Sequence, residues 1–236
     1  MNSPKKTILW ISLFAVAMGF LESTVVIYLR ELYYAKGFEF PLQLIPARIA
    51  RVEFLRELAT LIMLVAAGII AGRTRLERFA YFVFAFAIWD LFYYLFLYLC
   101  IGWPQSLSTW DILFLLPVPW VGPVWAPCLL CMIMIIGALH MVAKTNKKLY
   151  HSISIAHWWM MITGAFVSSV AFMWDYLAHT HRQNNSWSIL SSDNLFSDMS
   201  AYIPQQFNHA LFFTGFLFMC GSLILSFLKP IKHEIK

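Results

Sequence analysis

The sequence predicts an all-α protein that crosses a membrane as a bundle of six helices, and two observations lead to this class. First, 61% of the 236 residues are hydrophobic and only 12% are charged, which is about half the charged fraction of a soluble domain. Second, the apolar residues lie in long runs, with polar residues collected between them. A mean hydropathy of +0.69 agrees with a polytopic protein whose surroundings are the lipid bilayer.

Six runs come close to the ~20 apolar residues that a membrane-spanning helix needs. The predicted spans are about 7–29, 55–72, 78–101, 121–143, 153–178 and 205–228. The first run follows Lys5 and Lys6, as a signal peptide would, but it has no small-residue cleavage site and contains Glu22. We therefore expect it to be retained, so that residues 1–236 form a single integral membrane domain.

Two connections between the spans have compositions of their own. Residues 30–54 are charged, and the stretch PARIARVEFLREL that begins at Pro46 predicts an amphipathic interfacial helix running into the second span. Residues 102–120 are rich in Pro and Trp. Tryptophan suits the headgroup level and proline prevents a continuous helix, so we expect a re-entrant or surface-lying outer loop. The fourth span should become a regular helix only after Pro127.

Lys and Arg predict the orientation, because cytoplasmic loops carry an excess of them. With the N-terminus inside, the inner segments hold most of the 17 Lys and Arg residues. The first outer connection, residues 30–54, holds most of the others and is the exception to the rule. We therefore expect a protein of an inner or plasma membrane with both termini cytoplasmic. The net charge of +5 reports this topology and does not indicate nucleic-acid binding.

Carboxylates inside the spans are the strongest functional signal, because a charged side chain is costly in lipid and usually faces the protein interior. Glu22 lies in the first span, Glu57 near the start of the second, Asp90 in the middle of the third and Asp175 near the end of the fifth. In the predicted orientation all but Asp90 lie in the outer half. They predict an outward-facing pocket, with Glu22 and Asp90 deepest, that binds or translocates a small solute, an ion or a proton.

Histidines on the same side favour an alternative, a metal site. Asp175 and His179 are one helical turn apart, and His209 opens the last span. Mixed His and carboxylate ligands suit Zn, Cu, Fe or Mn, so these three residues would serve a metal-dependent membrane oxidoreductase or hydrolase. His181 would point about 200° away from His179 if the helix continues. A single haem at either end of the fifth span is a further alternative.

Cysteines and small residues leave other functions open. Cys128 and Cys131 form a CxxC at the start of the fourth span, where a redox pair could exchange electrons with a quinone. Cysteine is also an ordinary small apolar residue. The sequence contains no GxGxxG, P-loop, GxSxG or zinc-finger pattern, so a soluble-type ATPase or serine hydrolase is not expected. The remaining class is a non-catalytic subunit of a homo-oligomer or of a larger membrane complex.

Overall fold

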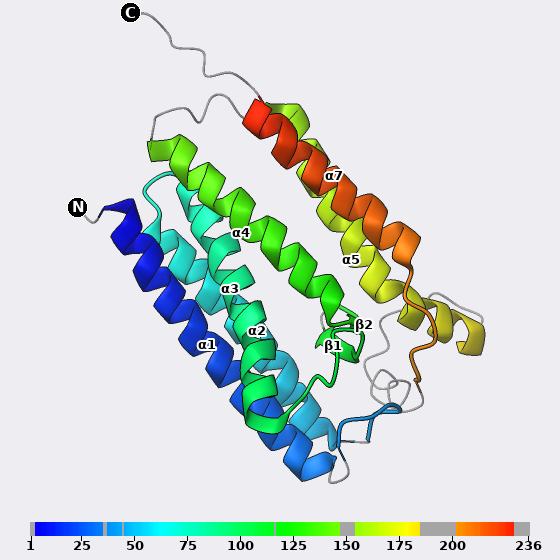
Figure 1. The fold of residues 1–236 in the computed structure, drawn as a ribbon. Helices are drawn as coiled ribbons and strands as arrows, with labels where there is room; N and C mark the ends of the chain where they lie inside the picture. The colour runs from blue at the N-terminus through cyan, green and yellow to red at the C-terminus, as the bar shows by residue number, and fades with distance from the viewer. Residues whose placement is uncertain are drawn as a thin grey trace, which may run out of the picture.

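The computed structural model describes residues 3–34, 37–43, 45–115, 117–146, 154–184 and 202–228. Within these residues six helices are long and apolar enough to cross a membrane, which confirms the predicted all-α, multi-pass class. Figure 1 shows them as α1 (Pro4–Tyr33), α2 (Ala47–Ala71), α3 (Arg75–Ile101), α4 (Trp125–Asn146), α5 (Ile155–Asn184) and α7 (His209–Leu228).

Local sequence explains where α3 begins and ends. The hydroxyl of Thr74 accepts a hydrogen bond from the backbone N–H of Glu77 at 3.1 Å. The Glu77 carboxylate in turn accepts from the backbone N–H of Arg73 at 2.8 Å. These two bonds satisfy N–H groups that have no partner in the first turn of a helix. At the other end, Gly102 has φ 66°, a left-handed conformation that glycine adopts without strain and that stops the helix.

Helix boundaries differ from the prediction at several places. α2 begins at Ala47 rather than near residue 55, because the amphipathic stretch and the span form one continuous helix. α4 begins at Trp125, and Pro127 lies in its first turn, where the missing N–H would have no helical partner anyway. α5 continues past residue 178 to Asn184, and α7 starts at His209 rather than residue 205.

The Pro- and Trp-rich connection contains a β-hairpin, an element that the sequence did not predict. β1 (Trp110–Phe114) pairs antiparallel with β2 (Trp120–Pro123). Strand pairing satisfies backbone groups that would otherwise be buried without partners in apolar surroundings. Val118 and Val121 are buried in one cluster with Tyr176 of α5. The expected surface-lying loop is therefore a folded part of the bundle.

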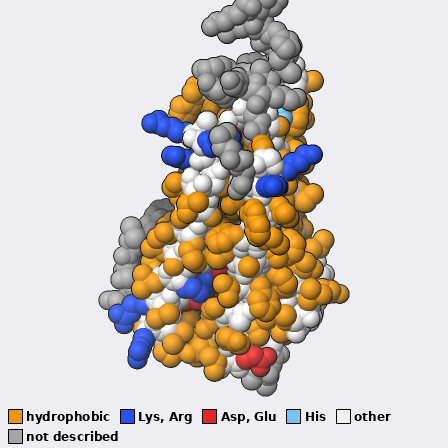
Figure 2. All heavy atoms as spheres, turned by 90° about the vertical axis from the view of Figure 1, so that its left-hand side faces the viewer, with side chains coloured by type: hydrophobic (Ala, Val, Ile, Leu, Met, Phe, Trp, Pro, Cys, Tyr) orange, Lys and Arg blue, Asp and Glu red, His pale blue; other side chains and the backbone are white. Residues whose placement is uncertain are grey.

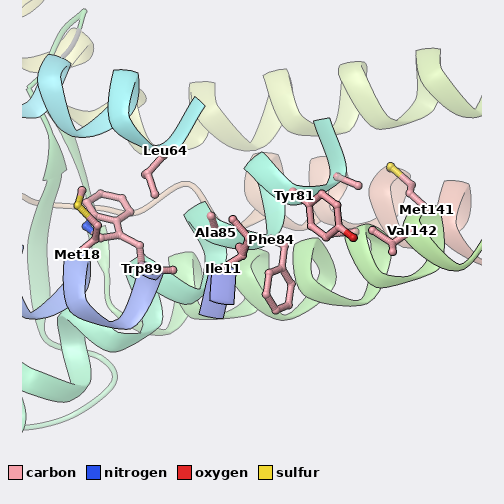
Figure 3. Packing of buried hydrophobic residues seen from close by; sticks show 12 residues of the cluster. Ile11, Met18, Leu64, Tyr81, Phe84, Ala85, Trp89, Met141 and Val142 are labelled. Atoms are coloured by element: carbon pink, nitrogen blue, oxygen red, sulfur yellow. The ribbon is translucent and has the colours of Figure 1, made fainter. Parts of the chain in front are cut away.

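The helices form two groups. α1 to α4 lie side by side, and α5 and α7 form a separate pair (Figure 1). Figure 3 shows side chains of the first group's core, which the four helices contribute together. Ile11 and Met18 come from α1, Leu64 from α2, Trp89 from α3 and Met141 from α4.

Small residues bring α5 and α7 into close contact, as expected for helices that associate in lipid. A Cβ atom added to Gly164 would lie 2.7 Å from the carbonyl oxygen of Gly215. One added to Gly215 would lie 2.5 Å from the hydroxyl of Ser168. Lys144 of α4 also donates to the carbonyl oxygen of Ser226 in the last turn of α7, at 2.9 Å. This bond links the helix pair to the first group.

The bundle has two distinguishable ends. α1 starts and α7 finishes at one end, and the β-hairpin lies at the opposite end, which we call the hairpin end (Figure 1). Figure 2 shows a broad apolar band on one face, with Lys and Arg side chains near both of its limits. A band of this kind is what contact with lipid tails requires. The predicted outer side corresponds to the hairpin end.

Candidate binding pocket

A cavity of about 150 Å³ opens at the hairpin end, between the last turns of α1, the first turns of α2, β1 and four residues of the first connection, Phe38, Leu42, Gln43 and Ile45. Most of its wall is apolar, and it includes the rings of three tyrosines and a phenylalanine. The polar side chains of the wall, apart from these tyrosines, are Arg30, Gln43, Glu53, Glu57 and Asp111. An apolar wall with a few polar groups is the usual composition of a small-molecule site.

An ion pair between Arg30 and Asp111 forms one side of the cavity. The Nη2 atom of Arg30, in the last turn of α1, lies 3.6 Å from Oδ1 of Asp111 in β1, and both side chains are buried. The guanidinium also lies between two aromatic rings, with Cζ 3.7 Å from the ring centre of Trp103 and 4.4 Å from that of Phe38. Cation–π contacts of this kind hold the guanidinium in place.

This ion pair leaves two polar atoms unused. Among the described residues, Nη1 of Arg30 and Oδ2 of Asp111 are buried without a hydrogen-bond partner. Leaving a buried donor or acceptor unsatisfied costs about 1–3 kcal/mol. Arg30 and Asp111, two residues of the wall, therefore carry one N–H donor and one carboxylate acceptor that the described residues do not satisfy.

Burial changes the proton affinity of Asp111. It raises the pKa of this carboxyl to about 6, although the positive charge of Arg30 acts in the opposite direction. The backbone N–H of Ile112 and the nearby hydroxyls of Tyr94 and Tyr93 also act to lower the pKa. Asp111 is thus charged at neutral pH but gains a proton in a mildly acidic medium.

Glu57 is the predicted site residue that does line the cavity. It lies in the third turn of α2, is 7% exposed, and accepts a hydrogen bond from the backbone N–H of Leu115 at 3.0 Å. This bond fastens the hairpin to α2. Within the described residues no salt bridge joins Glu57 to a Lys or Arg, since the neighbouring Arg56 is directed at two other carboxylates.

Glu22 does not form the floor of the cavity as predicted. It is paired with Nη1 of Arg56, and it also accepts from the hydroxyl of Thr60 at 3.4 Å. Arg56 binds Glu53 with two further bonds, at 3.0 Å and 2.6 Å, in the bidentate geometry that favours strong charge-assisted pairs. The cation that pairs with Glu22 thus comes from α2, and the three charges form a bridge between the two helices.

Asp90 lies apart from the cavity as well. It is buried in α3 and accepts a hydrogen bond from the thiol of Cys131 in α4, at 3.2 Å. Cys128, one turn earlier in α4, is half-buried, and both cysteines are free thiols. The structure therefore joins two predicted features, the deepest carboxylate and the CxxC, in one contact between α3 and α4. The redox role of Cys128 and Cys131 stays a prediction.

Asp175 has a different set of partners from the predicted one. It accepts from the hydroxyl of Tyr202 at 2.7 Å and from the backbone N–H groups of Gln205 and Gln206 at 3.0 Å and 3.4 Å. Burial and the Asp175 charge both raise the pKa of Tyr202, which keeps its hydroxyl protonated as a donor. Asp175 thus anchors the segment that leads into α7.

The predicted metal ligands are not gathered around one point. The ring of His209 stacks on Trp125, with the two planes 7° apart, and His179 contacts the edge of Tyr202. Within the part of the chain that the structure describes, no group of three His, Cys, Asp or Glu side chains is placed to hold a metal ion. The proposed set of Asp175, His179 and His209 is not assembled, because hydrogen bonds and ring contacts hold each residue elsewhere.

No family model, curated protein or solved structure matches this chain. The site must therefore be interpreted from its own geometry.

The sequence alone does not single out Arg30 and Asp111, two residues of the cavity wall. Arg30 lies at the start of a charged outer connection, and Asp111 lies within a largely apolar loop. The available signal was Asp111 itself, the one carboxylate in an otherwise apolar segment of Trp, Ile, Leu and Phe. A lone acid in such a segment calls for a buried partner.

Proposed function

We propose that this multi-pass membrane protein binds a small solute in the cavity at its hairpin end. The observation that carries the proposal is that Arg30 and Asp111 both line that cavity and that each has one buried polar atom, Nη1 and Oδ2, without a partner among the described residues. If this wall served packing alone, we would expect apolar side chains here, because an ion pair buried without full hydrogen bonding usually adds little stability. In the predicted orientation the cavity faces the outside of the cell, and binding there would be the first step of uptake or sensing.

Filling the cavity tests the proposal. Val26 lines it from α1, so Val26→Trp should occupy the space where a solute would bind. The matched control is Leu21→Trp on the same helix, since Leu21 is 60% exposed on the lipid-facing surface. Wild-type and variant proteins in detergent would be screened against a panel of small amines, alcohols and carboxylates, with melting temperature as the measurement.

Solutes that bind the folded protein raise its melting temperature. We expect members of the panel to do so for the wild type and for Leu21→Trp, and to have no effect on Val26→Trp. Equal stabilisation of all three proteins would place binding elsewhere, and stabilisation of none would contradict a solute-binding function.

A further inference from the structure

We propose that the solute is a small organic cation, a protonated amine with an apolar body. This inference rests on the proposed binding function and adds the chemical class of the ligand. Three features of the cavity support it: an excess of carboxylates, acceptor atoms that an ammonium group can use, and an aromatic wall.

The charges around the cavity do not balance within the protein. Glu53, Glu57, Asp111 and the adjacent Glu22 are carboxylates, whereas the guanidinium groups among them are those of Arg30 and Arg56. Arg56 is shared between Glu22 and Glu53, and Arg30 pairs with Asp111. Glu57 is left without a salt bridge among the described residues. A cationic ligand would compensate this excess, whereas an anion would add to it.

Hydrogen bonding favours the same class. An ammonium group has three donors and no acceptor. Among the described residues, Oδ2 of Asp111 is a buried acceptor without a partner. The structure shows one hydrogen bond to Glu57, from the backbone N–H of Leu115. The unused Nη1 of Arg30 supplies a donor, which a hydroxyl or carbonyl beside the amine would satisfy. The Arg30 charge is already opposed by Asp111 and stacked on two rings, so it does not call for an anion.

The remaining wall suits the body of such a ligand. Tyr33, Tyr34, Phe38 and Tyr93 line the cavity, and aromatic faces attract organic cations. Aliphatic side chains from α1 and β1, together with Leu42 and Ile45, complete the wall. Its volume of about 150 Å³ is well above the ~10–15 Å³ that one water needs, so a molecule of ring size fits.

Three probes that share one ring but differ in charge test the inference. Benzylamine is a cation, benzyl alcohol is neutral and benzoate is an anion at neutral pH. Their dissociation constants would be measured by titration calorimetry on the full-length protein in lipid nanodiscs. We expect benzylamine to bind at least about tenfold more tightly than either of the others, the difference that about 1.4 kcal/mol provides.

Substitutions of the carboxylates in the cavity wall test whether these residues cause the preference for the amine. Glu57→Gln and Asp111→Asn should each weaken benzylamine binding by about tenfold or more and leave benzyl alcohol unchanged. Glu57→Asp keeps the charge and should retain the preference for the amine. Glu31→Gln is the matched control, because Glu31 is an exposed carboxylate next to Arg30 in α1. Unchanged binding of benzyl alcohol also shows that each variant is folded.

The outcomes separate this inference from the proposed function. If benzyl alcohol or benzoate binds as tightly as benzylamine and Val26→Trp abolishes both, the cavity binds solutes but the cation class is wrong. If benzylamine binds and neither Glu57→Gln nor Asp111→Asn weakens it, the assignment to these carboxylates is overturned. If no probe binds while an alcohol or a carboxylate of the solute panel does, the ligand class is again wrong and the binding function stands.

Discussion

Arg30 and Asp111 place opposite charges in a nearly dry setting, and the consequence is seen at Asp111. Burial raises the pKa of its carboxyl to about 6. Between its ordinary value and about 6, Asp111 holds a proton in the folded protein that it would lose in the unfolded chain. The contribution of this group to folding stability therefore decreases as the pH rises through that window.

The affinity for a cation should instead increase as the pH rises, because only the ionised carboxylate attracts the cation. The affinity for benzylamine should decrease by about tenfold between pH ~7.5 and pH ~5, since one unit below the pKa only about a tenth of the carboxyl is ionised. The groups around Asp111 are Arg30 of α1, Tyr93 and Tyr94 of α3, and the carboxylates of Asp90 in α3 and Glu57 in α2.

Asp111→Asn assigns this pH dependence to one residue. Glu53 and Glu57 also line the cavity, so a pH profile of the wild type alone would not identify the titrating group. Calorimetric titrations of the variant across the same pH range should give an affinity that depends less steeply on pH than that of the wild type. A slope as steep as that of the wild type would show that another carboxyl is responsible.

At the level of elements, the close contact between α5 and α7 depends on glycine residues, which have no side chain. Gly164→Ala should lower the melting temperature, because its Cβ would meet the carbonyl oxygen of Gly215 and the two backbones cannot move apart freely. The expected loss is about 1–3 kcal/mol of unfolding free energy, as for other overpacked sites.

Gly137→Ala in α4 is the matched control, because nothing lies within 4 Å of its added Cβ. Replacing a helical glycine at an open position should stabilise the protein by about 0.5–1 kcal/mol. Thermal unfolding in the same detergent compares the two variants. If both glycines respond alike, close packing of α5 on α7 is not what Gly164 provides.

The elements differ in how far the sequence could predict them. Spans were predictable because lipid imposes a run of about 20 apolar residues, and each run stands out from its flanks. The hairpin was not, because β1 and β2 are short, apolar and interrupted by proline, so they show no alternation of polar and apolar residues. Its partner residues in α2 and α5 come from distant parts of the chain.

The candidate site could be predicted only in part, for the same reason. The cost of a carboxylate in lipid identifies the carboxylates within the spans as important, but the sequence does not identify their hydrogen-bond and ion-pair partners. Glu22 and Arg56 are 34 positions apart, Glu57 and Leu115 are 58 apart, and only the folded bundle joins them. A sequence pattern reports which residues need a partner and leaves open which partner they find.

For the whole molecule, orientation remains a prediction that labelling can test. Gln43 lies exposed at the hairpin end, and Arg75 lies exposed at the start of α3, at the other end. In a Cys100→Ser background, which removes the exposed native thiol, Gln43→Cys should react with a membrane-impermeant maleimide in intact cells. Arg75→Cys should react only after permeabilisation. The reverse pattern would place both termini outside and turn the cavity toward the cytoplasm.

The bridge from Glu22 through Arg56 to Glu53 bears on how this chain is made. α1 is synthesised first, with a carboxylate whose cation is encoded in the next helix. A lone acid at the centre of a helix costs about 2.5–3.5 kcal/mol on insertion into lipid, and Glu22 is released from much of that cost once Arg56 emerges. We therefore expect the first two helices to leave the insertion machinery together, as one unit in which Glu22 is already paired with Arg56.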